Sequence, residues 1–130
     1  MPRLSPYQRS QAKALALKTP PLEVVRNQFP GRAYEVRIEA PEFTCLCPKT
    51  GQPDFATITV DYSPAAHIVE LRSFKLYLQC FRQQGIFHES AANRILDDFV
   101  AACRPRKARV VADFSVRGGI HTVVEARHHW

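Results

Sequence analysis

Residues 43–55 read Phe43-Thr44-Cys45-Leu46-Cys47-Pro48-Lys49-Thr50-Gly51-Gln52-Pro53-Asp54-Phe55 and predict the turn of a β-hairpin. Gly and Pro punctuate the segment between Cys47 and Asp54, so it is expected to be a loop and not a helix. Strand-like segments precede and follow it. The chain is therefore expected to fold back and to bring the Cys47 thiol and the Asp54 carboxylate into one pocket. The alternative is a solvent-facing loop that carries an ordinary cysteine.

The flanking segments have the alternation of half-buried strands. Apolar positions alternate with charged ones over 34–40, and Pro41 is expected to end that strand. After the loop, 54–62 alternates again, and 67–71 predicts a short extended piece. Two further alternating segments, 108–114 and 120–126, are expected to form a second hairpin. Its turn is predicted at Arg117-Gly118-Gly119.

Two helices are expected between these hairpins, because apolar residues recur there at helical spacing. The first is predicted from Ser73, as N-cap, to Gly85, as the residue after its C-terminus. The second has its apolar face over 92–103 and is stopped by Pro105. The order strand, strand, helix, helix, strand, strand predicts an α+β fold, with both helices on one face of a four-stranded antiparallel sheet. Open edges of such a sheet predict a homo-oligomer.

Composition is that of one soluble domain: 130 residues, of which 45% are hydrophobic and 23% charged. Residues 1–30 are predicted to be a basic N-terminal extension with a net charge of +4, and 31–130 a single catalytic domain. A short helix is possible over 8–17. The extension could contact nucleic acid, but a solvated tail is favoured. No membrane span or signal peptide is predicted, which favours a cytoplasmic location.

The four cysteines, Cys45, Cys47, Cys80 and Cys103, predict neither a disulfide framework nor a metal site. The Cys-x-Cys spacing of the first two is tight, and the chain has no second paired set of zinc ligands. A cysteine beside an acid instead suits covalent addition to an electrophilic carbon, followed by delivery of a proton. No metal is therefore expected.

Two other segments carry polar groups that the fold does not require. Glu70, Arg72 and Lys75 crowd the start of the first helix, where two cations and backbone amides suit a phosphate. Taken alone, a solvated helix end is the favoured interpretation. In Phe87-His88-Glu89, a carboxylate beside an imidazole could grip a guanidine-like edge. Equally, Glu89 could simply occupy the first turn of the second helix, where the helix dipole favours a carboxylate.

Four segments together resemble the NADPH-dependent nitrile reductases that convert 7-cyano-7-deazaguanine to 7-aminomethyl-7-deazaguanine in the biosynthesis of queuosine, a modified tRNA nucleoside. The matching segments are Glu42 to Phe55, Glu70 to Tyr77, Phe87-His88-Glu89 and Arg117-Gly118-Gly119-Ile120. The resemblance implies a tunnelling fold of the single-module type. It also implies subunits that assemble into a multi-subunit barrel of stacked rings, with a deazapurine substrate bound at subunit interfaces.

The resemblance implies a role for each matched residue. Cys47 is expected to form a thioimide with the nitrile, Asp54 to donate a proton, and His88 to act beside the reacting group. The substrate-binding set is Val69, Glu70, Leu71, His88 and Glu89. NADPH is the expected cofactor, contacted by Arg72, Lys75, Arg117 and Gly118. The family usually has Lys where this chain has Arg72, which puts cofactor affinity in question.

Two other functions compete with the reductase. A related enzyme uses the same thioimide to transfer an amine onto a nitrile already in tRNA, and the basic N-terminus would suit tRNA. A non-catalytic module that holds purines between subunits is the other. The Glu70 to Tyr77 segment favours the reductase, so nucleic acid is not an expected partner.

Overall fold

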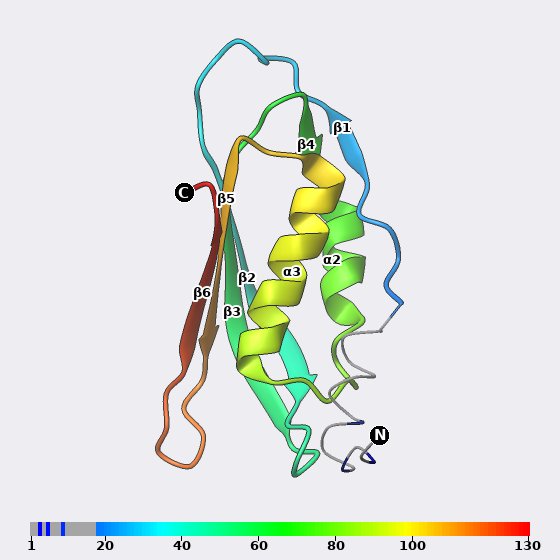
Figure 1. Cartoon of the computed structure of the whole chain (residues 1–130), viewed down its shortest axis with the longest axis vertical. Helices are drawn as coiled ribbons and strands as arrows, with labels where there is room; N and C mark the ends of the chain where they lie inside the picture. The colour runs from blue at the N-terminus through cyan, green and yellow to red at the C-terminus, as the bar shows by residue number, and fades with distance from the viewer. Residues whose placement is uncertain (1–2, 4, 6–8, 10–17) are drawn as a thin grey trace.

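The computed structural model of the chain describes residues 3, 5, 9 and 18–130 (Figure 1). The possible helix over 8–17 lies outside the described residues, apart from Arg9. In the part of the chain that is described, no helix is both long and apolar enough to cross a bilayer.

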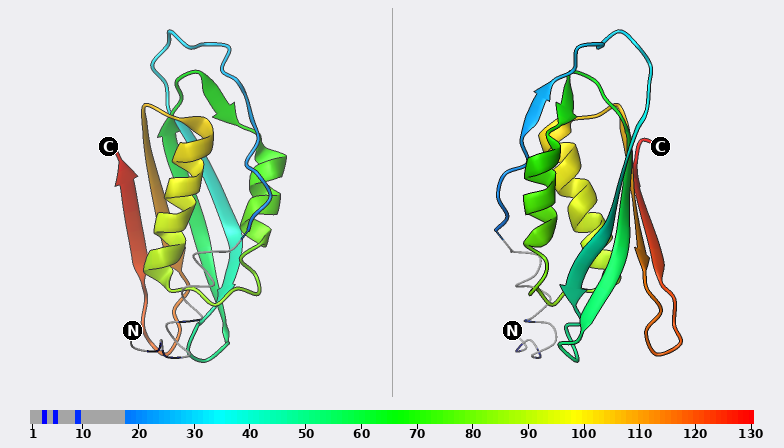
Figure 2. Two further views of the ribbon diagram at one scale, coloured as in Figure 1. Left: turned by 45° about the vertical axis from the view of Figure 1, so that its right-hand side comes forward. Right: turned by 180° about the vertical axis from the view of Figure 1, so that it is seen from behind.

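Four strands form one antiparallel sheet. Its order is β2-β3-β5-β6, with β2 at Val36–Leu46, β3 at Pro53–Ser63, β5 at Lys107–Phe114 and β6 at Val123–His128. Alternate residues of the two central strands are buried: Ala56, Ile58, Val60 and Tyr62 in β3, and Ala108, Val110, Ala112 and Phe114 in β5. Both helices cover this face (Figure 2). The predicted α+β layer is confirmed.

The helices α2 (Leu71–Gln79) and α3 (His88–Cys103) complete the core. The ring of Phe99 from α3 packs edge-on against Tyr62 of β3, with centroids 4.8 Å apart. The Tyr77 hydroxyl of α2 donates a hydrogen bond to the Asp98 carboxylate of α3. The two helices are thus fixed to the sheet and to each other.

The predicted ends of the first helix are wrong. Glu70, not Ser73, is its N-cap, because the Glu70 carboxylate accepts hydrogen bonds from the backbone N–H groups of Arg72 and Ser73. The helix ends at Gln79, and Gly85 lies in the connection to α3. There the N–H of Leu46 donates to the Gln84 carbonyl, which ties this connection to the end of β2.

Pro41 does not end the first long strand. The β2 strand continues to Leu46, and a register shift between Ala40 and Phe43 accommodates the irregularity. A proline is tolerated here because β2 is an edge strand of the sheet, where a missing N–H costs no ladder bond. In the second hairpin, β6 begins at Val123 and not at residue 120, but the turn predicted at Arg117-Gly118-Gly119 is confirmed, because Arg117 and Ile120 pair across the two glycines.

A small second sheet joins the N-terminal region to the body of the chain. Strand β1 (Val24–Arg26) pairs antiparallel with β4 (His67–Val69), with Val24 opposite Val69. The extended segment at 67–71 was predicted, but the sequence pattern indicated no strand at 24–26. This pairing places the start of α2 beside the N-terminal region (Figure 1).

Candidate active site

The turn between β2 and β3 presents Cys47 at one end of the molecule. The Cys47 N–H donates to the Gln52 carbonyl, and the Gly51 N–H donates to the Cys47 carbonyl, each at 2.8 Å. Gly51 has a φ of 73°, a left-handed conformation that glycine adopts without steric cost. These bonds close the turn and leave the Cys47 thiol partly exposed.

The surroundings of Cys47 favour its thiolate form. Burial by itself would raise the pKa of the thiol. Hydrogen bonds from the Thr50 side chain, from the backbone N–H groups of Thr50 and Lys49, and from Arg117 outweigh burial and lower that pKa from 9.0 to about 7. By contrast, Cys45 is completely buried, and burial raises its pKa to about 12. Only Cys47 of this pair therefore has the properties of a nucleophile at neutral pH.

The second residue of β3, Asp54, forms two polar contacts. Its side chain is only 5% exposed. The guanidinium Nε of Arg117 lies 2.7 Å from Oδ1, and Nε2 of His88 lies 3.1 Å from Oδ2. The carboxylate thus joins the connection between β5 and β6 to the first residue of α3.

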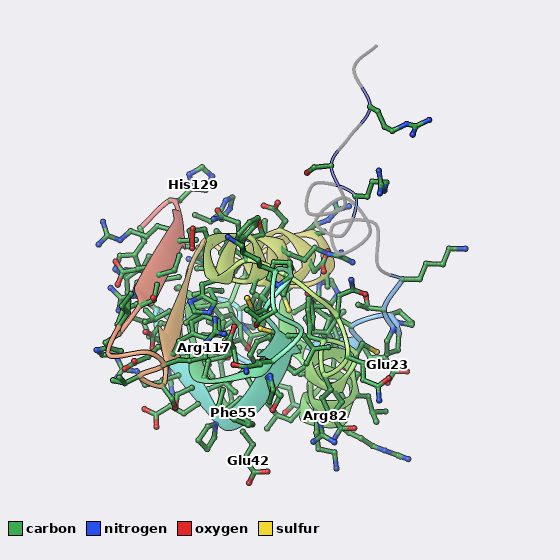
Figure 3. The ribbon with its side chains drawn as sticks, turned by 90° about the horizontal axis from the view of Figure 1, so that it is seen from below. Glu23, Glu42, Phe55, Arg82, Arg117 and His129 are labelled. Atoms are coloured by element: carbon green, nitrogen blue, oxygen red, sulfur yellow. The ribbon has the colours of Figure 1, made fainter. Side chains whose placement is uncertain are left out.

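Cys47, Asp54, His88 and Arg117 consequently gather at one end of the molecule, although they come from four separate segments. Figure 1 shows the β2–β3 turn, the start of α3 and the β5–β6 connection at the same end. Figure 3 looks onto this end and shows Arg117 inward of Phe55 and Glu42. We refer to the four side chains as the cysteine cluster. A thiol, a carboxylate, an imidazole and a guanidinium in contact can carry out addition and proton transfer.

Val69, Glu70 and Leu71 lie elsewhere, at the junction of β4 and α2. Val69 is buried, Leu71 is 61% exposed, and both Glu70 oxygens accept hydrogen bonds from the start of α2. Helix α2 runs from this junction toward the end that holds the cysteine cluster (Figure 1). Its nine residues correspond to roughly 13 Å. Within one chain, the two groups of predicted residues do not form one pocket.

Glu89 is exposed beside His88, on the outer surface of α3. It borders a shallow hollow of about 330 Å³ together with Ser90, Asn93, Arg94 and Asp97. Its carboxylate is therefore accessible to a ligand that reaches His88 from outside.

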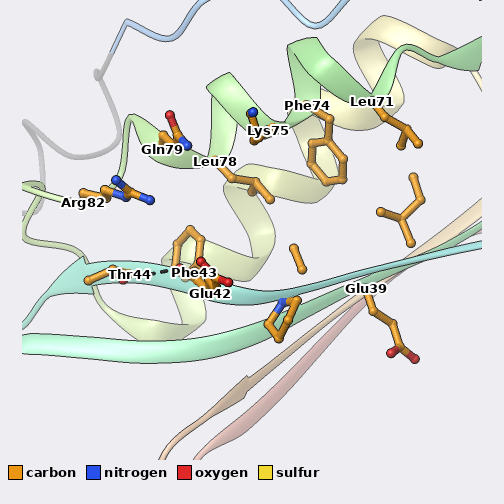
Figure 4. Close-up of a pocket in the computed structure, with 13 residues that line it drawn as sticks. Glu39, Glu42, Phe43, Thr44, Leu71, Phe74, Lys75, Leu78, Gln79 and Arg82 are labelled. Atoms are coloured by element: carbon orange, nitrogen blue, oxygen red, sulfur yellow. Dashed lines mark hydrogen bonds between the residues drawn. The ribbon is translucent and has the colours of Figure 1, made fainter.

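One pocket is a groove between α2 and β2, and none of the four side chains of the cysteine cluster lines it (Figure 4). Its volume is about 370 Å³, and its walls include Phe43, Phe74 and Leu78. Of the predicted cofactor residues, Lys75 lines it, and Arg82 adds a second cation. Arg72 is exposed on α2, whereas Arg117 and Gly118 lie on the β5–β6 connection. The cofactor residues thus fall into two groups.

Two residues of the site were missed by sequence reasoning. Phe114 of β5 stacks on the His88 ring, but in the sequence it is one of many alternating apolar residues. Thr50 contacts Cys47 from within the turn. Its hydroxyl, three residues after the cysteine, was the feature of the sequence that could have indicated this contact. Among the described residues, no group of three or more His, Cys, Asp or Glu side chains is arranged to hold a metal ion.

Comparisons with known proteins agree on one family. The family model described as QueF-like protein matches residues 53–130. An NADPH-dependent 7-cyano-7-deazaguanine reductase of Anaeromyxobacter sp. (strain K) is 62% identical over 107 residues, which is 82% of this chain and 88% of that protein. The protein of the same name from Halorhodospira halophila is 57% identical over 108 residues, covering 83% and 92% of the two chains.

A solved structure has the same architecture. The crystal structure of the archaeosine synthase QueF-Like in the apo form superposes with a TM-score of 0.69 at 25% sequence identity. The match covers 74% of this chain and 94% of that one.

Proposed function

Because the chain belongs to the QueF-like family, we propose that it reduces the nitrile 7-cyano-7-deazaguanine to 7-aminomethyl-7-deazaguanine, through a cysteine thioimide and two hydride transfers. It is an NADPH-dependent oxidoreductase. The observation that carries the mechanism is Cys47, a partly exposed thiol with a lowered pKa in contact with the pair of Arg117 and Asp54.

The first step is addition of the Cys47 thiolate to the nitrile carbon. The new S–C bond forms as one π bond of the nitrile breaks, and the nitrogen takes up a proton. A nitrile is a weak electrophile, so the thiolate is needed to create a reducible C=N bond. Asp54 is the proposed proton donor: its carboxylate passes to the nitrogen a proton that it takes from His88, whose Nε2 lies 3.1 Å from Oδ2.

NADPH, when bound, supplies hydride twice in succession, taking nitrile to imine and imine to amine. The groove between α2 and β2 suits such a ligand, since it combines apolar walls with Lys75 and Arg82. Arg72 and Lys75 are proposed to hold cofactor phosphates, and an arginine at the first position retains the charge and offers a fork of donors. Arg117 and Gly118 are proposed to contact the cofactor from the cysteine cluster.

The substrate is proposed to bind between subunits of a homo-oligomer. The cysteine cluster and the Val69 to Leu71 junction lie at different ends of α2, so a single chain does not surround a small ligand with both. Strands β2 and β6 are the edges of the four-stranded sheet and remain available for pairing in a multi-subunit barrel. Glu89 would grip the aminopyrimidinone edge of the substrate through two N–H bonds.

NADPH absorbance tests the proposal. Wild-type protein mixed with 7-cyano-7-deazaguanine is expected to consume two NADPH per nitrile. Cys47→Ala is expected to consume none, and Cys80→Ala, which removes a thiol at the end of α2, is expected to match wild type. A thioimide adduct without NADPH oxidation would overturn the reductase and favour the tRNA transferase. Full activity in Cys47→Ala would overturn the nucleophile.

A further inference from the structure

The connection between β5 and β6 holds Arg117 in a tight turn. The Arg117 N–H donates to the Ile120 carbonyl, and the Ile120 N–H donates to the Arg117 carbonyl, each at 3.1 Å. Between them, Gly118 and Gly119 have φ values of 60° and 78°. The N–H of Ser115 donates to the Phe55 carbonyl, which ties the start of this connection to β3. The backbone that carries Arg117 is thus fixed beside Asp54.

The guanidinium of Arg117 is shared between two groups. Its Nε lies 2.7 Å from Asp54 Oδ1, and the guanidinium also donates a hydrogen bond to the Cys47 sulfur. The other titratable groups that face this pair are His88, on the second Asp54 oxygen, and the buried thiol of Cys45. Arg117 therefore places a permanent positive charge in contact with the sulfur.

We infer that Arg117 activates the nucleophile: clamped by Asp54, its guanidinium serves as the counter-ion of the Cys47 thiolate. This role differs from the cofactor contact assigned to Arg117 above, and it rests on the proposed function only in taking Cys47 as the nucleophile. With this counter-ion, Cys47 loses its proton to solvent before the substrate arrives, and the addition step requires no general base.

Electrostatics gives the sign of the effect of Arg117 on the pKa of Cys47. In the absence of Arg117, no cation would lie against both the thiolate and the Asp54 carboxylate, and two neighbouring negative charges disfavour ionisation of the thiol. When Arg117 is present, its positive charge attracts both the Cys47 thiolate and the Asp54 carboxylate and offsets that repulsion. Thr50 and the backbone N–H groups would still favour the thiolate, so only part of the lowered pKa would be lost.

The test is the rate of alkylation of Cys47 by iodoacetamide as a function of pH, followed by mass spectrometry, with neither nitrile nor NADPH present. Wild type is expected to show a midpoint at about pH 7. In Arg117→Gln the midpoint is expected to rise by about one pH unit, which makes alkylation about eightfold slower at pH 6.5 and nearly unchanged at pH 9.5. Arg117→Lys keeps the charge and should fall between the two.

Arg32→Gln is the matched control, because it removes an equal charge from an exposed residue outside the cysteine cluster. Its profile should coincide with wild type. A wild-type midpoint in both Arg117 variants would overturn the inference, as would a rate lowered equally at every pH. Failure of the proposed function has a different signature: wild type would oxidise no NADPH with the nitrile, while the alkylation profiles would still differ.

Discussion

The imidazole ring of His88 stacks face to face on the ring of Phe114, with centroids 3.6 Å apart and planes inclined by only 5°. Phe114 is the last residue of β5 and is 1% exposed, so the sheet holds it firmly. The stack fixes the plane in which the imidazole lies. It thereby directs Nε2 toward Asp54. The hydrophobic core thus orients a polar side chain of the candidate site.

Replacing Phe114 by Leu should therefore impair turnover as well as stability. The substitution removes the flat surface under His88, and small misplacements of a catalytic group can cost about 10- to 100-fold in rate. We expect kcat to fall by about tenfold and the free energy of unfolding by about 1–2 kcal/mol. Steady-state kinetics and urea denaturation measure the two quantities.

Phe99→Leu separates these effects, because Phe99 is equally buried but packs against Tyr62 and Phe74. It should be destabilised to a similar extent and should retain its kcat at a temperature where both variants are folded. If both variants lost the same fraction of kcat, the stack would have no specific role in positioning His88.

A second polar cluster stabilises the opposite face of the sheet. Asp61 of β3 is 8% exposed and forms ion pairs with Arg37 of β2 at 2.7 Å and with Arg109 of β5 at 3.2 Å. Burial would raise the pKa of Asp61, but hydrogen bonds from the two arginines lower it below its ordinary value. We expect Asp61→Asn to reduce the free energy of unfolding by about 2–3 kcal/mol at pH 7, since it leaves Arg109 without its charged partner.

The pH dependence of this effect follows from the direction of the shift. A lowered pKa means that Asp61 stabilises the fold above the pKa of the unfolded chain, about 3.9, and that this contribution declines as pH falls through the folded-state value. The difference between wild type and Asp61→Asn should therefore narrow between pH 5 and pH 3. Urea denaturation over that pH range measures this difference in the free energy of unfolding. A difference that stayed constant with pH would contradict the role of the Asp61 charge.

Local patterns predicted the central strands and the second helix well, because each has a long buried face. Alternation in β3 and β5 was sufficient, since those strands are central to the sheet. Sequence patterns failed where contacts between distant segments determined the local structure. Pro41 was tolerated at an edge, and Glu70 took the cap that Ser73 was expected to provide. Strand β1 has only three residues, too few for a pattern.

The candidate site was predictable only in part for a similar reason. The turn that carries Cys47 and Asp54 is local, so its residues could be identified from their order along the chain. The contact of Arg117 with Asp54 joins segments that are distant in sequence, and no periodicity reports it. The resemblance named Arg117 for its contact with the cofactor. The structure places it against the carboxylate and the thiol as well.

Glu70 provides a third prediction, because its carboxylate caps α2. Glu70→Ala should lower the melting temperature by several degrees, since two N–H groups at the helix start lose their acceptor. Glu70→Asp should retain most of the melting temperature, because aspartate is a favoured N-cap. If Glu70 also binds substrate, the shorter side chain should still raise KM. Equal melting temperatures in all three proteins would exclude the capping role.

Gly118 tests whether the turn that carries Arg117 matters for the nucleophile. Its φ of 60° is left-handed, and a Cβ built there meets no atom within 4 Å, so Gly118→Ala adds backbone strain of about 1–2 kcal/mol without a clash. The strain should loosen the turn and move the alkylation midpoint of Cys47 upward, in the same direction as Arg117→Gln.

Two matched variants sharpen the interpretation of this result. Gly118→Asn should shift the midpoint less than Gly118→Ala, because asparagine tolerates the left-handed region. Gly31→Ala also meets no atom within 4 Å and carries no positive φ, so it should leave the midpoint unchanged. Because the assay contains no NADPH, loss of the proposed contact between Gly118 and the cofactor cannot produce the shift. An unshifted midpoint in Gly118→Ala would mean that Arg117 reaches Cys47 and Asp54 whatever the conformation of its turn.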